Sequence, residues 1–113
     1  MKLSDELADK LFAERMELIH SSLSIKAKEY VRNDDRMHNF NVAAELEGKT
    51  REEVLHGFRL KQEVSRRDLL KDIEEGNMPT EAHVREKYGD IINYFILEEM
   101  SVLHKIHEHG KDR

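Results

Sequence analysis

The segment Thr80–Leu103, TEAHVREKYGDIINYFILEEMSVL, limits the possible folds most, because it is the longest strongly periodic stretch and the most apolar. Its apolar and aromatic side chains fall within an arc of about 140° on a helical wheel, which predicts a helix packed on a core. The arc holds Val84, Tyr88, Ile91, Ile92, Phe95, Ile96, Val102 and Leu103, and Ile106 continues it. The opposite side carries Glu86, Asp90 and Asn93 beside Leu97. This mixture predicts a helix that is covered on both sides.

The rest of the chain predicts an all-α bundle of four to five helices, formed by a single domain over residues 1–113. One proline and almost no β-branched alternation leave little support for strands. The expected helices cover residues 4–31, 36–47, 50–64, 65–75 and 80–106, followed by a frayed tail over 107–113. Thr50 with Glu53, and Ser65 with Asp68, have the spacing of capping boxes that begin helices. The long first and last helices form the spine of this bundle.

Composition excludes several classes of function. The chain has no cysteine, which excludes disulfides, cysteine-ligated zinc and thiol catalysis. A net charge of −5 argues against a general nucleic-acid binder, which usually carries a basic excess. The N-terminal sequence MKLSDELADK turns charged at once, so a signal peptide is not expected. No window reaches the roughly 18 apolar residues that a membrane-spanning helix needs. We therefore expect a cytoplasmic protein.

Glu86 and Asp90 are the candidate metal ligands. Side chains four residues apart on a helix lie one above the other, so these two carboxylates can converge on one cation. Oxygen ligands suit Mg²⁺, which also binds phosphate oxygens. The alternative is an ordinary charged surface, because the chain has 24 acidic residues and Arg85 and Lys87 stand beside this pair. Spacing alone leaves both interpretations open.

Residues 85–97, REKYGDIINYFIL, resemble the last catalytic helix of the all-α nucleoside triphosphate pyrophosphatases, the MazG and dimeric dUTPase superfamily. A wider set of short motifs resembles small phage proteins of the nucleotide-modification-associated type. These motifs lie at 26–30, 39–40, 50–70 and 86–94, so the resemblance covers about residues 26–103. It implies a phage-type, MazG-like helical fold that binds a nucleotide with magnesium.

The resemblance assigns magnesium to Glu86 and Asp90 and a polar contact to Asn93. Tyr94, next to Asn93, is a further candidate ligand-binding residue. Lys61 is a candidate contact to a phosphate or to Asp90. The chain departs from the superfamily pattern in two ways. Its acidic pair is spaced Glu-x-x-x-Asp instead of Glu-x-x-Asp, and the earlier Glu-x-x-Glu motif has no clean match in residues 50–75.

A second candidate surface comes from the residues alone. It is a mixed basic and aromatic patch that is able to cradle an anionic nucleotide, with Tyr30 or Phe40 stacking on the base. The patch consists of Lys28, Tyr30, Arg32, Arg36, Asn39 and Phe40. The alternative is a solvated charged face beside a buried ring, with Phe40 in the core.

Two functions stay open from sequence. One is a nucleotide-binding protein that, if catalytic, is a metal-dependent nucleoside triphosphate pyrophosphatase. The other is a non-enzymatic phage accessory protein that binds a host protein or sequesters a nucleotide signal. Both long helices have apolar residues beyond a single stripe, which predicts a homodimer or a higher homo-oligomer.

Overall fold

The protein is all-α, as the sequence predicts. The computed structural model describes residues 1–111, apart from the side chain of Tyr30. Its α-helices are α1 (Asp5–His20), α2 (His38–Glu47), α3 (Arg51–Glu74) and α4 (Glu81–Lys111). Two short segments, the π-helix η1 (Ser21–Ile25) and the 3₁₀-helix η2 (Lys26–Tyr30), extend α1. The expected path of the first helix to about Val31 is therefore helical, but its hydrogen bonding changes at the serines.

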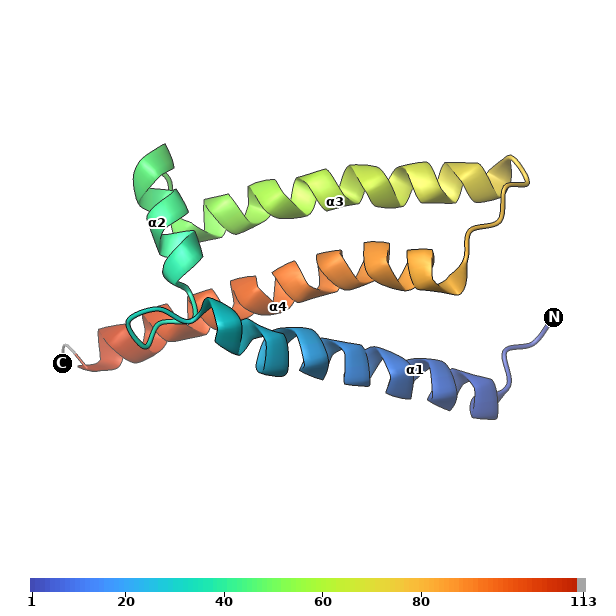
Figure 1. Cartoon of the computed structure of the whole chain (residues 1–113), viewed down its shortest axis with the longest axis horizontal. Helices are drawn as coiled ribbons and strands as arrows, with labels where there is room; N and C mark the ends of the chain where they lie inside the picture. The colour runs from blue at the N-terminus through green and yellow to red at the C-terminus, as the bar shows by residue number, and fades with distance from the viewer. Residues whose placement is uncertain (112–113) are drawn as a thin grey trace.

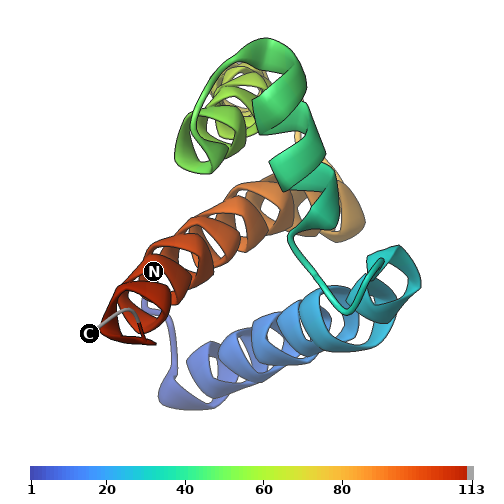
Figure 2. The ribbon, with the colours of Figure 1, turned by 90° about the vertical axis from the view of Figure 1, so that its left-hand side faces the viewer.

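The helices are arranged around α4, which lies between α3 and α1 in two perpendicular views (Figures 1 and 2). The α3 helix runs antiparallel to α4, so that Arg51 near its start meets Ser101 and Arg59 meets Glu98. The α1 helix runs in the same direction as α4 and diverges from it towards the N-terminus (Figure 1). The short α2 helix packs on α3. Each of the outer helices thus depends on the α3–α4 pair.

The helix ends follow local chemistry. Thr50 and Glu53 form the predicted capping box, and the Thr80 hydroxyl accepts a hydrogen bond from the His83 amide at 3.2 Å. Gly48 ends α2 at a φ of 64°, a left-handed conformation that costs glycine little. In the predicted break at residues 32–35, Asn33 and Asp34 also have positive φ, which these two residue types tolerate better than most.

Two predicted boundaries are wrong. The α3 helix passes through Ser65 without interruption, so Ser65 and Asp68 do not begin a new helix. A serine inside a helix costs only a few tenths of a kcal/mol relative to good helix formers, and packing against α4 outweighs it. The last helix continues past Ile106 to Lys111. Of the tail predicted at residues 107–113, positions 112 and 113 lie outside the described residues.

The apolar core is small. Its buried apolar residues are Met37, Ala44, Val54, Leu55, Leu69 and Ile91. Much of the arc predicted as the core face of the last helix is instead exposed to solvent. The exposed fraction is 50% for Phe95 and 63% for Ile106. The C-terminal part of this arc is exposed because the 31-residue α4 extends past the start of α3 (Figure 1), whereas Phe95 lies beside α3 under the Arg59 guanidinium, 4.1 Å from its ring centre.

A polar network joins three helices where α3 begins. Arg51 donates from Nε to the Ser101 hydroxyl at 2.5 Å, from Nη2 to the Ser101 carbonyl at 3.1 Å, and from Nη1 to Asn41 on α2 at 3.1 Å. Ser101 is fully buried and its hydroxyl donates to Glu52, which also accepts from Lys105. Burial raises the pKa of Glu52, but the hydrogen bonds from Lys105 and Ser101 outweigh it and lower this pKa.

We predict that Ser101→Ala lowers the free energy of unfolding by about 1–3 kcal/mol, because Arg51 and Glu52 then lose a buried partner. Urea denaturation followed by circular dichroism measures this change. Ser65→Ala is the matched control, since Ser65 lies half-buried inside α3. Equal unfolding midpoints for the two variants would contradict a structural role for the network.

Candidate functional site

Two adjoining grooves meet along α4 and gather most of the predicted site residues. The α1–α4 groove has a volume of about 570 Å³ and includes Arg15, Ser22, Glu86, Asp90 and Asn93 in its lining. The α2–α4 groove, about 360 Å³, is lined in part by Ser22, Arg36, Asn39, Phe40, Asp90, Asn93 and Tyr94. Ser22, Asp90 and Asn93 belong to both grooves. The candidate site is therefore one continuous surface that α4 shares with the end of α1 and the start of α2.

Asp90 stands at the junction in an environment that disfavours its charge. Burial raises the pKa of its carboxyl, the neighbouring charge of Glu86 raises it further, and Lys87 partly opposes both. Glu86 is exposed one helical turn earlier and lines only the α1–α4 groove. The two carboxylates thus lie close enough to repel each other, as the predicted metal pair requires.

Asn93 and Tyr94 form the next part of the wall. The Asn93 side-chain oxygen is buried and has no hydrogen-bond partner among residues 1–111. An unsatisfied buried acceptor of this kind costs about 1–3 kcal/mol, which a donor or a cation in the groove would offset. Tyr94 stacks on Phe58 with ring centroids 5.8 Å apart, and Phe58 meets the edge of Phe40 at 6.2 Å. Burial and then the charge of Asp90 raise the pKa of Tyr94.

Arg15 enters the α1–α4 groove over a glycine. Its Nη2 donates to the Arg85 carbonyl at 2.9 Å, and a Cβ built on Gly89 would lie 2.8 Å from its Nη1. The absence of a side chain at Gly89 therefore makes the space that the guanidinium occupies. Arg85 itself is paired with Glu14 and with Glu81. Arg15 has no carboxylate partner among the described residues, so its positive charge stays available to the groove.

Arg36 supplies a second cation, in the α2–α4 groove. Its Nη1 donates to the Leu23 carbonyl at 3.2 Å, and the side chain is exposed. Arg36, Asn39 and Phe40 were predicted from sequence as part of a separate patch, and the structure brings them together with Asp90 and Asn93. Sequence reasoning missed Arg15. The sequence does contain one sign of its role, because Arg15 is a charged residue between the leucines that form an apolar stripe on the first helix.

Three of the predicted site residues lie outside the grooves. Lys61 on α3, and Lys28 and Arg32 of the predicted basic and aromatic patch, are exposed and line neither groove. The side chain of Tyr30 lies outside the described part of the chain.

Within residues 1–111 no cluster of three or more histidine, aspartate or glutamate side chains could hold a metal ion. The candidate oxygen donors on this part of α4 are the carboxylates of Glu86 and Asp90 and the side-chain oxygen of Asn93. Carboxylate oxygens are the type of ligand that Mg²⁺ takes, usually one or two of them together with phosphate oxygens and water.

Comparisons of the chain with protein-family models, curated proteins and solved structures found no match. In the described part of the chain, no helix combines the length and the apolar character needed to cross a lipid bilayer.

We predict that Asp90→Asn raises the thermal midpoint at neutral pH. A raised folded-state pKa means that ionisation of Asp90 lowers stability as pH rises through that pKa. The loss is complete above the raised pKa and absent below the ordinary value of 3.8. Thermal unfolding of both proteins at neutral pH and near pH 3.5 tests this. The gain should disappear at acid pH, and a gain of equal size at both pH values would refute the electrostatic cause.

We predict that Gly89→Ala stabilises the Arg15→Ala protein by about 1 kcal/mol, the helix-propensity difference, and stabilises wild type by less. In wild type the new Cβ must first displace the Arg15 guanidinium. Urea unfolding of the four proteins in this double-mutant cycle measures the difference. Gly57→Ala in α3 is the control, because no heavy atom lies within 4 Å of its added Cβ and its effect should be the same in both backgrounds.

Proposed function

We propose that the two adjoining grooves bind a nucleoside phosphate together with Mg²⁺. The observation that supports this most is the gathering of Asp90 and Asn93 with two arginines, Arg15 and Arg36, each held by a backbone carbonyl. A carboxylate pair for a cation and guanidinium groups for phosphate oxygens are the two parts that such a ligand requires.

Glu86 and Asp90 would hold the Mg²⁺. Their mutual repulsion, together with burial at Asp90, makes a bound cation favourable there because it neutralises both carboxylates. Mg²⁺ held by these carboxylates would supply positive charge for the phosphate groups of the ligand. The Asn93 side-chain oxygen, which is buried without a partner among the described residues, is the third acceptor on this wall.

Arg15 and Arg36 would receive the phosphates from the two sides of Asp90. Each has Nη groups beyond the one that its carbonyl partner uses, and a guanidinium binds phosphate oxygens with charge-assisted hydrogen bonds. The base would lie in the α2–α4 groove beside Phe40 and Tyr94, whose rings belong to the aromatic cluster around Phe58. Lys61 has no role in this arrangement, and its contact with a ligand stays a prediction from sequence.

Hydrolysis and sequestration are two versions of this proposal. Cleavage of an α–β phosphoanhydride by water needs carboxylates that position the metal and its bound water. With two carboxylates in the donor set and no third acid clustered with them among residues 1–111, the arrangement favours binding over rapid turnover. We therefore propose nucleotide binding as the function and treat pyrophosphate release as a measurable addition to it.

We predict that Asp90→Asn and Arg15→Gln each weaken Mg²⁺-dependent binding of a nucleoside triphosphate about tenfold or more. Each substitution removes one charged group, and a loss of affinity of about tenfold corresponds to the loss of one charge-assisted contact. Isothermal titration calorimetry with a panel of nucleoside mono-, di- and triphosphates, with and without MgCl₂, measures the affinities. Asp72→Asn and Arg67→Gln are matched controls, because both residues are exposed on α3 and line neither groove.

The outcomes separate the alternatives. Binding with release of pyrophosphate identifies a hydrolase, and binding without release identifies a protein that sequesters its nucleotide. Equal losses in the control variants would place the ligand elsewhere on the molecule. Failure of wild type to bind any member of the panel would refute both versions.

A further inference from the structure

The single chain exposes much more surface than a compact protein of its size. Its accessible surface is 8902 Å², whereas about 6,500 Å² is typical of a folded monomer of this mass. Its radius of gyration is 17.2 Å, against about 13 Å for a compact domain of this length. The excess of about 2,400 Å² per chain is the area that each partner of a large, obligate dimer buries.

The excess surface includes the α1 helix. None of its residues is buried. Its long-range contacts are the Arg15 and Glu14 hydrogen bonds to Arg85 and limited packing against α4. An isolated helix of 16 residues is only marginally stable in water, and helices in proteins are stabilised mainly by burial of an apolar face. The chain by itself supplies little of that burial.

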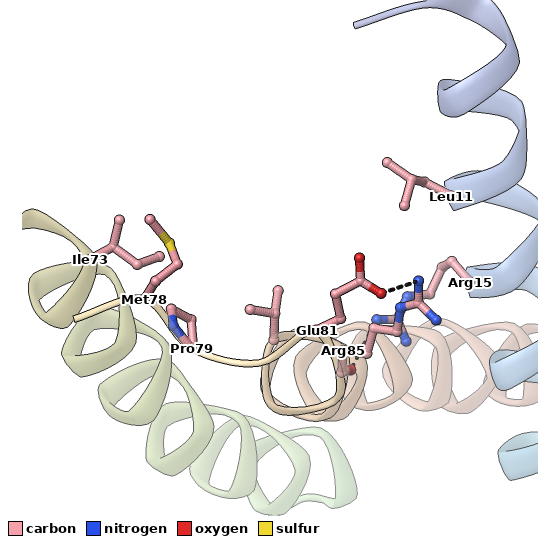
Figure 3. A pocket seen from close by; sticks show the side chains of 8 residues that line it. Leu11, Arg15, Ile73, Met78, Pro79, Glu81 and Arg85 are labelled. Carbon is pink, nitrogen blue, oxygen red and sulfur yellow. Dashed lines mark hydrogen bonds and ion pairs between the residues drawn. The ribbon is translucent and has the colours of Figure 1, made fainter. Parts of the chain in front are cut away.

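An apolar hollow opens between the N-terminal half of α1 and the turn that joins α3 to α4. Leu11 lies on one side and Ile73 with Met78 on the other, across the first turns of α4 (Figure 3). We call this hollow the α1–α3 trough. Its volume is about 310 Å³, and Met78 is 77% exposed. Arg15, Glu81 and Arg85 stand at its polar edge.

We propose that a second copy of this chain fills the α1–α3 trough with its own α1, and that the two copies bind each other reciprocally. One side of α1 borders its own trough with Leu11, while another side carries Phe12 and Met16, which are 67% and 48% exposed. A helix that is apolar on both sides can border one trough and fill another. Such a reciprocal contact is what a two-fold dimer requires.

The charge pattern of α1 disfavours a lipid surface as the occupant. Helices that lie on anionic membranes carry mainly Lys and Arg on their polar side. The polar residues of α1 are mostly acidic, namely Asp5, Glu6, Asp9, Glu14 and Glu17 against Lys10 and Arg15. The match between the excess area and an obligate dimer interface favours a second copy over a small ligand.

The test is the association state of the full chain by analytical ultracentrifugation. Wild type should sediment as a dimer and Phe12→Glu as a monomer. Phe12 is 67% exposed within one chain, so a glutamate there disturbs the fold of that chain little. Leu46→Glu on α2 is the matched control, since Leu46 is 81% exposed and far from the trough, and it should stay dimeric. A monomeric wild type, or a Phe12→Glu protein that remains dimeric, would overturn the proposal.

Two further measurements hold even if Phe12→Glu fails to fold. The thermal midpoint of wild type should rise by about 3 °C for each tenfold increase in protein concentration, as expected for unfolding coupled to dissociation. The chain has no cysteine, so single-cysteine variants report contacts cleanly. Phe12→Cys mixed with a tagged Met78→Cys should form a crosslinked pair on oxidation, and Leu46→Cys should not. A concentration-independent midpoint, or an absent Phe12–Met78 crosslink, counts against the dimer, as does wild-type binding to anionic vesicles as a monomer.

Discussion

The antiparallel pair formed by α3 and α4 supports the other helices, because α2 packs on α3 and α1 packs on α4. The two helices pack along their length and bury Leu55 and Leu69 on α3 and Ile91 on α4. Arg51 fixes the register of the pair by donating hydrogen bonds to both the hydroxyl and the carbonyl of Ser101. A purely apolar seam between two long helices tolerates sliding by a turn. The Arg51 contacts do not, because a shift of one turn would leave a buried hydroxyl and a guanidinium without partners.

This register determines which residues share the grooves. With α4 held by α3, the next face of α4 presents Gly89 and Asn93 to α1, and the edge between the two faces presents Asp90 and Tyr94 to the start of α2. The helix therefore has two packing faces and a polar edge between them. A carboxylate at such an edge is partly dehydrated, which raises the pKa of Asp90 and makes this position the most electrostatically unfavourable acid on α4. Groups in unfavourable environments of this kind are concentrated at functional sites.

Sequence periodicity predicted the helices and most of their ends, since caps such as Thr50 and Gly48 act through bonds within a few residues. It failed at Ser65, where a local capping signal competes with packing along the whole of α3 and packing wins. Glu86, Asp90 and Asn93 were recognised from the sequence as neighbours on one side of α4 because they lie on one helix, and the structure places all three in the lining of the α1–α4 groove. Arg15 was missed because its role depends on Gly89, more than seventy residues away, and a wheel of α1 alone cannot reveal that contact.

Part of the exposed apolar surface follows from the length of α4. A helix of 31 residues extends beyond the start of α3, so Val102 and Ile106 remain outside the core, and α1 diverges from the other end of α4 (Figure 1). A helical wheel shows only that one face of a helix is apolar. It therefore assigns the residues of that face to the core, whether the surface that buries them belongs to the same chain or to another chain. The error in the predicted core face and the reciprocal use of α1 that we propose for two copies thus have the same explanation: apolar periodicity indicates burial, and burial can be completed between chains.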